Sequence, residues 1–251
     1  FYFDVYMPSL VFNHITAFNI NNHEDIGLET LMVGYANTLY MSEKNLYIAH
    51  QKDYPYYYYT KQQTDQEDKF FTVVVPVLPN HIRDALEDIR QDYTDPYERM
   101  QKIYEAYQDL FNKLSDSEKQ RVRDEVAKAL AEYEEKLQEE RQKTVIHRFS
   151  LDETAINYEG KGEVKGQLLN QFSLDEYKDH LRVATTFYLY GGGTTSYNNV
   201  YVLDAAMNIV GTLERVAPDE RIYSTRFIDD RLYMVTFKQV DPFFVIDLQQ
   251  P

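Results

Sequence analysis

Histidines are the residues of this chain whose type and spacing come nearest to metal chemistry. There are six of them: His14, His23, His50, His81, His147 and His180. No two stand in the HExxH pattern, which places two zinc ligands on one face of a helix. His50 and His147 fall at the ends of strands expected to be neighbours, so they could approach each other. Half-buried strand positions are the favoured explanation, and no catalytic residue, metal ligand or cofactor is assigned from the sequence.

Other reactive patterns are missing or have a structural explanation. The chain has no cysteine, which excludes disulfides, thiolate chemistry and cysteine-bound metals. It has neither a GxSxG elbow nor an SxxK pair, which counts against a serine hydrolase. The glycines Gly191, Gly192 and Gly193 precede an expected strand and not a helix, so they cannot place a phosphate at a helix N-terminus and are interpreted as a turn.

A run of tyrosines from Tyr54 to Tyr59, broken only by Pro55, could form a ligand surface, because tyrosine joins an apolar ring to a polar tip. Tyrosine makes up 23 of the 251 residues, however, and this abundance favours a structural role for the run.

Charge and hydropathy narrow the range of partners. The formal net charge of −15 argues against nucleic acid, whose binding depends on lysine and arginine neutralising phosphates, and against anionic lipid. No apolar run approaches the roughly 20 residues of a membrane helix, so no membrane insertion is expected within this segment. Hydrophobic residues make up 43% of the chain, enough to bury a sizeable core.

A three-strand pattern recurs along the chain and must position any site. In its clearest copy, Glu220 to Leu248, a two-residue turn at Asp229-Asp230 and a turn at Asp241-Pro242 separate three apolar strands. The middle strand recurs as LYIAH, LRVATT and LYMVTF, starting at Leu46, Leu181 and Leu232. The following strand recurs as TVIHRFSLD, VYVLD and FFVIDL, starting at Thr144, Val200 and Phe243, with a fourth copy, ITAFNIN, at Ile15.

The spacing of these copies is 51 residues for the middle strand, from Leu181 to Leu232, and 43 for the next, from Val200 to Phe243. A four-stranded propeller blade takes roughly 40–50 residues. A two-sheet sandwich is the alternative, but the joint recurrence of strand type, order and spacing favours the propeller.

Three of these segments, residues 172–186, 198–224 and 225–248, resemble archaeal and bacterial secreted proteins with a β-propeller domain distantly related to WD40 repeats. The likeness covers residues 144–251 well and residues 15–50 loosely. It implies a propeller architecture and an extracytoplasmic location, secreted or at the cell surface. It implies no catalytic residues.

Between Leu78 and Lys143 the hydrophobic period changes to that of helices, in the segment that separates the strand at Leu46 from the strand at Thr144. One long helix is expected after Asp95 as N-cap, with Pro96 first and Glu98 completing the cap. Its apolar stripe consists of Tyr97, Met100, Ile103, Tyr104, Tyr107, Leu110, Phe111 and Leu114. A second opens with a capping box at Ser115 to Glu118. Its stripe consists of Val122, Val126, Leu130, Tyr133 and Leu137. A shorter helix is expected from about His81 to Arg90.

The expected fold is therefore mainly β with an α-helical insertion: a partial β-propeller of about two complete four-stranded blades plus flanking strands. Residues 1–78 and 144–251 form the blades, and residues 79–143 form the insertion. In the next unit the equivalent strands are joined only by the hairpin loop Gly191 to Asn199. Because propellers have 4–8 blades, the chain is expected to be a piece of a longer protein; a ring of several copies is the alternative. Uncovered blades would allow self-association.

For function, the sequence favours a non-catalytic extracytoplasmic binding or scaffold module over an enzyme. Its partner would be a protein or another envelope component. The stripe from Val122 to Leu137 has heptad-like spacing that could pair with another helix, although packing within the insertion is favoured. The alternative is a hydrolase whose active site lies at the propeller channel or in a part of the protein outside these residues. Fold alone does not decide between them.

Overall fold

The structure is a computed structural model of the chain, and it describes residues 10–22, 24–52, 66–190, 195–238 and 242–249. The tyrosine run Tyr54 to Tyr59, the three glycines from Gly191 and the turn residue Asp241 lie outside the described residues. The chain divides into two compact units: a β unit, Phe1–Pro55 with Gln138–Pro251, and a helical unit, Tyr56–Leu137.

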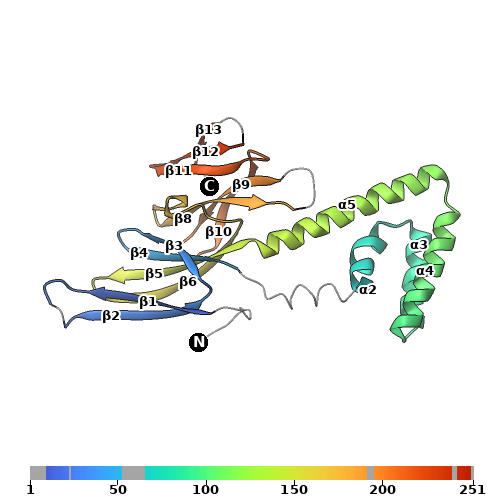
Figure 1. The fold of residues 1–251 in the computed structure, drawn as a ribbon, viewed down its shortest axis with the longest axis horizontal. Coiled ribbons are helices and arrows are strands. Elements are labelled where there is room, and N and C mark those ends of the chain that lie inside the picture. Colours follow the sequence, from blue (N-terminus) through green and yellow to red (C-terminus); the bar gives the residue numbers. More distant parts are fainter. Residues whose placement is uncertain (1–9, 23, 53–65, 191–194, 239–241, 250–251) are drawn as a thin grey trace. The chain divides into compact units, whose positions relative to one another are not determined.

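The β unit consists of four antiparallel sheets that follow one another along the chain (Figure 1). The first sheet pairs β1 (Val11–Phe18) with β2 (Ile26–Val33). The second contains β3 (Ala36–Met41), β4 (Asn45–Gln51), β5 (Lys143–Asp152) and β6 (Ala155–Lys165). The third contains β7 (Leu174–Tyr177), β8 (His180–Tyr188), β9 (Ser196–Leu203) and β10 (Ile209–Val216). The last contains β11 (Arg221–Ile228), β12 (Arg231–Phe237) and β13 (Phe243–Asp247).

Within every sheet each strand pairs with the next one in sequence, as in a propeller blade. Two complete four-stranded sheets with flanking strands confirm the fold class predicted from the sequence. The two-residue turn at Asp229-Asp230 is confirmed as well: Asp229 adopts φ 50°, the left-handed conformation that tight hairpin turns require.

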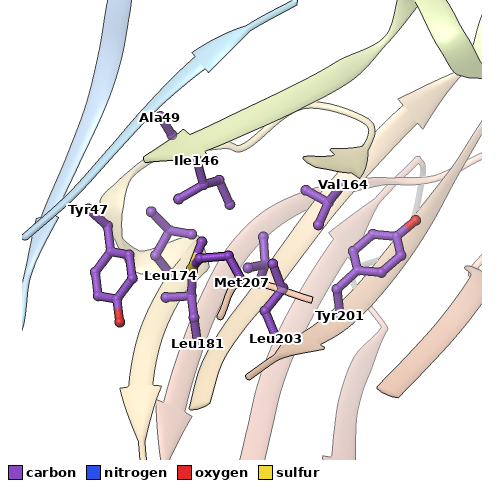
Figure 2. Packing of buried hydrophobic residues seen from close by; sticks show 10 residues of the cluster. Tyr47, Ala49, Ile146, Val164, Leu174, Leu181, Tyr201, Leu203 and Met207 are labelled. Carbon is purple, nitrogen blue, oxygen red and sulfur yellow. The ribbon is translucent and has the colours of Figure 1, made fainter. Parts of the chain in front are cut away.

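Each sheet packs on its neighbours through a separate apolar layer. Leu46, Ile48 and Phe149 of the second sheet face the first sheet, where Ile15 and Leu31 cover them. The opposite face of the second sheet meets the third (Figure 2). That layer contains Tyr47, Ala49, Ile146, Val164, Leu174, Leu181, Val183, Tyr201, Leu203 and Met207. A further layer between the third and fourth sheets contains Ala184, Val200, Ile222, Leu232 and Met234.

Gly162 on β6 allows the second and third sheets to approach closely. A Cβ atom at this position would lie 2.6 Å from Cδ2 of Leu203 and 2.7 Å from the carbonyl oxygen of Met207. Those distances are shorter than any ordinary contact, and the carbonyl belongs to the backbone, so only glycine fits here without moving the third sheet.

The helical unit has a core of its own. Its long helices are α3 (Asn80–Asp92), α4 (Pro96–Asn112) and α5 (Asp116–Arg141), whose last turn belongs to the β unit. A short helix α2 (Gln66–Lys69), a π-helical turn (Phe70–Val74) and a 3-10 turn (Val75–Val77) precede them. The buried core residues are Phe71, Val75, Leu78, Ile82, Leu86, Ile103, Leu114 and Val122. Among the described helices, none is both long and apolar enough to cross a membrane.

Both predicted helix caps are present. The Asp95 carboxylate accepts a hydrogen bond from the Glu98 backbone N–H at 2.8 Å. At the start of α5, the Ser115 N–H donates to the Glu118 carboxylate at 2.9 Å and the Glu118 N–H donates to the Ser115 hydroxyl at 3.4 Å, the reciprocal pair of a capping box.

Three details differ from the sequence-based expectation. Residues 66–77, assigned to the blades, are helical, because Phe71 and Val75 pack into the helical core. Tyr97 and Tyr104, assigned to the buried stripe of α4, are 83% and 64% exposed. At about 100° per residue they point 100–120° away from the buried Ile103, at the edge of the stripe. The loop assigned to residues 191–199 is shorter, because β9 already begins at Ser196.

Candidate functional site: a histidine pair at the ends of the inserted segment

Two buried imidazoles meet where the inserted segment, residues 52–142, leaves β4 and returns at β5. His50 and His147 are only 3% and 5% exposed. Their Nε2 atoms are 3.2 Å apart, within hydrogen-bond distance. The ring centroids are 5.3 Å apart and the planes differ by 16°, so the rings meet end to end and do not stack face to face. Strand register explains the meeting: His50 pairs with Val145 and His147 with Ile48, which places both histidines on one face of neighbouring strands.

A fixed direction runs through the hydrogen bonds of this pair. The Gln51 carbonyl can only accept, so His50 donates to it from Nδ1 at 3.0 Å. A neutral His50 therefore accepts at Nε2, and His147 donates to it from Nε2. His147 in turn accepts at Nδ1 from the Tyr158 hydroxyl, 3.2 Å away. Each group thus donates to the next: Tyr158 to His147, His147 to His50, and His50 to the Gln51 carbonyl. We call these three hydrogen bonds the histidine chain.

Burial sets the protonation state of the histidine chain. Desolvation, reinforced by His50, lowers the pKa of His147 to about 4, because a buried imidazolium has lost its water. Burial likewise raises the pKa of Tyr158, so its hydroxyl keeps its proton. At neutral pH His147 is therefore uncharged, and the Tyr158 hydroxyl retains the proton that it donates.

The geometry suits a hydrogen bond better than a metal site. Zinc binds its ligands tetrahedrally, so two imidazoles on one ion converge on it at an angle of about 109°. The two rings instead meet end to end, with each Nε2 directed at the other, so their nitrogens do not converge on a common ion. Within the ranges that the structure describes, no three His, Cys, Asp or Glu side chains form a group able to hold a metal ion.

Charged pairs surround the same strand ends. The Lys52 ammonium lies 2.9 Å from the Glu163 carboxylate, and Lys143 lies 3.9 Å from that carboxylate. Lys143 also forms an ion pair with Glu140 of α5 at 2.8 Å. The Lys52 N–H donates to the Lys143 carbonyl at 2.8 Å, so the two ends of the inserted segment are hydrogen-bonded to each other.

Gln138 in the last turn of α5 and Gln142, directly after that helix, complete the surroundings. The Gln142 side chain donates to the Tyr188 carbonyl at 2.6 Å and accepts from the Tyr188 N–H at 3.1 Å. The Gln138 side chain does the same with Tyr190, at 2.8 Å and 2.9 Å. Since Tyr188 and Tyr190 point their backbone groups to the same side, the amides act like a neighbouring strand at the edge of β8.

A second polar cluster joins the second and third sheets. The Glu176 carboxylate on β7 accepts hydrogen bonds from the Ser42 hydroxyl at 2.5 Å, the Asn45 amide at 2.8 Å and the Tyr47 hydroxyl at 3.1 Å. Its backbone N–H donates to the Tyr40 hydroxyl at 3.0 Å. An open depression of about 570 Å³ lies beside it. Because the Glu176 carboxylate of the third sheet accepts from three donors of the second sheet, the cluster ties the two sheets together.

The sequence indicated some of these residues and missed others. It predicted that His50 and His147 could approach each other, and the structure brings them together. The other described histidines lie on separate elements, His14 on β1, His81 on α3 and His180 on β8, while His23 lies outside the described residues. Tyr158, Gln138, Gln142 and Glu176 were not singled out, because their roles depend on contacts between strands and sheets that no local pattern signals.

Comparisons with known proteins agree with this architecture. The β-propeller domain family matches residues 1–251. An uncharacterized protein of Methanocaldococcus jannaschii is 31% identical over 240 residues, which cover 94% of this chain and 37% of that protein. An uncharacterized protein of Archaeoglobus fulgidus is 34% identical over 215 residues, 86% of this chain and 32% of that protein. The chain thus spans about a third of the length of these relatives. No solved structure matches. The chain belongs to the β-propeller domain family.

Proposed function

We propose that this chain is part of an extracytoplasmic binding or scaffold protein, and that the helical unit carries the surface for a protein or envelope partner. The observation that supports this is a unit with its own core inserted between two strands of one blade. The equivalent strands of the next blade, β8 and β9, are joined by residues 189–195 alone. Closing a blade therefore does not need the helical unit, and its retention calls for another role.

The surface of α4 supports a role in binding. Tyr97 and Tyr104 are 83% and 64% exposed, and a spacing of seven residues places them on one side of the helix. Tyrosine joins an apolar ring to a polar tip and is enriched among the residues that dominate binding energy at protein interfaces. On this proposal the two rings are part of the contact.

The proposal is tested with the full-length protein and an envelope fraction of the source cells. Chemical crosslinking followed by purification should recover the same partner repeatedly with the wild type. The double variant Tyr97→Ser/Tyr104→Ser should lose that partner. The matched control Lys128→Ser/Glu132→Ser alters two exposed residues of α5, whose side chains are 78% and 59% exposed, and should retain it. Equal recovery from both variants would place the binding surface elsewhere and contradict the role of α4.

The location is a separate part of the proposal and rests on the likeness to secreted propeller proteins. Protease added to intact cells should degrade the full-length protein while a cytoplasmic marker survives. Protection of the protein until the cells are lysed would contradict an extracytoplasmic location.

A further inference from the structure

The histidine chain lies two residues from the point where β4 gives way to the inserted segment. Beyond His50, one more residue pair, Gln51 with Thr144, closes the strand ends before the segment begins. We propose that the His50–His147 hydrogen bond is an acid-sensitive clasp, which holds the ends of β4 and β5 together at neutral pH and releases them on acidification.

The direction of the hydrogen bonds explains why protons open the clasp. A first proton can bind His147 Nδ1 only if the Tyr158 hydroxyl rotates from donor to acceptor. This protonation creates a positive charge in a buried site. A second proton must take His50 Nε2, which is the acceptor of the bond between the rings. Two N–H groups would then face each other at a distance of 3.2 Å, so the doubly protonated pair cannot keep its contact.

The charged groups that the structure describes near the pair are positively charged or already hold a partner. Within the described residues, the charged groups on this face of the second sheet, or packed against it, are Lys161, Glu163 and Lys165 of β6, Lys143 of β5, Lys52 after β4 and Glu29 of β2. Lys161 is the register partner of His147, so its ammonium opposes a second positive charge. Glu163 is already paired with Lys52 at 2.9 Å, and Glu29 accepts a hydrogen bond from the Thr30 N–H at 3.2 Å. Strand β3, sequence ANTLYM, contributes no charged side chain.

The sign of the pH effect follows from the difference between closed and open states. In the closed state the pKa of His147 is about 4, whereas an imidazole in water titrates near 6.5. The open state therefore binds more protons below about pH 6.5, and acid favours opening. Opening should be constant above that pH and increase as the pH falls toward 4, by up to about tenfold per pH unit for each histidine released.

Native-state hydrogen exchange on the full-length protein tests the clasp. We expect protection of residues 45–52 and 143–150 to fall 10- to 100-fold more between pH 7 and pH 4.5 than protection of the control strands β8 and β9, after correction for intrinsic exchange. In the double variant His50→Gln/His147→Gln, which keeps polar side chains but cannot be protonated, this excess should disappear. An unchanged excess in the double variant, or no excess in the wild type, would overturn the proposal.

A second measurement covers the case in which the double variant does not fold. In the wild type, 15N spectra of the histidine rings should show both rings of the pair neutral at pH 6 and charging only as β4–β5 protection is lost. Titration of either ring near pH 6.5 with that protection intact would overturn the clasp.

Discussion

The side-chain amide of Gln142 occupies both backbone hydrogen-bonding groups of Tyr188, its nitrogen 2.6 Å from the carbonyl oxygen and its oxygen 3.1 Å from the N–H nitrogen. Hydrogen-bond partners therefore follow one another along this edge of β8. Strand β7 pairs with its first residues, and the Gln167 backbone N–H donates to the Thr186 carbonyl at 2.8 Å. Gln142 and Gln138 bind the backbone beyond that point. Gln138 of α5 and Gln142 just after that helix cover the last part of what would otherwise be an open strand edge, which proteins commonly protect.

Replacing Gln142 with alanine should therefore destabilise the β unit. Gln142 is 9% exposed, and its loss leaves the N–H and the carbonyl of Tyr188 without partners, at a cost of about 1–3 kcal/mol. The comparison variant Gln138→Ala acts at the more exposed Tyr190 and should cost about 0.5 kcal/mol or less. Denaturant unfolding of both variants measures the difference, and equal losses would contradict the assigned role.

The histidine chain predicts which nitrogen of each ring carries the proton. At pH 7, 15N spectra should show His147 protonated at Nε2 and His50 protonated at Nδ1. Tyr158→Phe removes the donor to His147 Nδ1 and should cost about 0.5–1.5 kcal/mol while leaving the proton on Nε2, because that proton is still needed by His50. The opposite tautomer in the wild type would contradict the direction of the hydrogen bonds.

Removing the helical unit should leave the blades folded. The Lys52 N–H already donates to the Lys143 carbonyl at 2.8 Å, so residues 53–142 can be replaced by Asn-Gly, which forms a tight two-residue hairpin turn. We expect cooperative unfolding at a lower Tm, since Gln138 and Gln142 are lost with the segment. A second variant that replaces only residues 53–137 with a flexible linker retains both glutamines and should recover part of the loss. A non-cooperative transition in both would show that the blades need the helices.

The carboxylate between the second and third sheets should be sensitive to a change of one atom. Glu176→Gln puts an NH₂ group among three donors, from Ser42, Asn45 and Tyr47, and should cost about 1.5–3 kcal/mol, the range for hydrogen bonds to charged groups. The control Glu43→Gln lies beside the same depression, is exposed, and should change the free energy of unfolding by less than about 0.5 kcal/mol. Chemical denaturation of the two variants distinguishes these outcomes.

The outer faces of the first and last sheets should make the isolated 251-residue chain associate. Phe18 and Ile26, a cross-strand pair, are 63% and 59% exposed, and on the last sheet Tyr223 and Phe243 are 66% and 61% exposed. Contiguous apolar surface of this kind is unusual on a monomer. Sedimentation velocity should show concentration-dependent association that Tyr223→Ser/Phe243→Ser reduces and Tyr97→Ser does not. A monomer at all concentrations would contradict the prediction.

The strands were largely predictable because their signals are local. The alternation from Tyr223 to Phe227 and the turn at Asp229-Asp230 are properties of neighbouring residues, as are the caps at Asp95 and Ser115. The run FFTVVV from Phe70 was grouped with the blades, and its β-branched residues do favour strands. Burial of Phe71 and Val75 in the helical core outweighs that preference.

The polar contacts were far less predictable. Asn198 and Asn199 look like loop residues, yet both lie fully buried in β9. The Asn198 amide oxygen accepts from the Thr186 hydroxyl at 2.8 Å, and that of Asn199 accepts from the Arg215 N–H at 3.1 Å, partners 12 and 16 residues away. Strand positions suggested that His50 and His147 meet, but the direction of their hydrogen bond depends on the Gln51 carbonyl, which lies 3.0 Å from His50 Nδ1.

The separation of β4 from β5 along the chain has a kinetic consequence. Every other pair of adjacent strands in a sheet is joined by a short connection, such as residues 189–195, whereas β4 and β5 are separated by residues 52–142. Closing a flexible loop roughly tenfold longer costs about 2 kcal/mol more entropy. The other hairpins of the second sheet can form from neighbouring residues, so we expect the pairing of β4 with β5 to be the slowest step in assembling this sheet. Early folding of the helical unit would speed that step, because an ordered segment leaves fewer free residues to close.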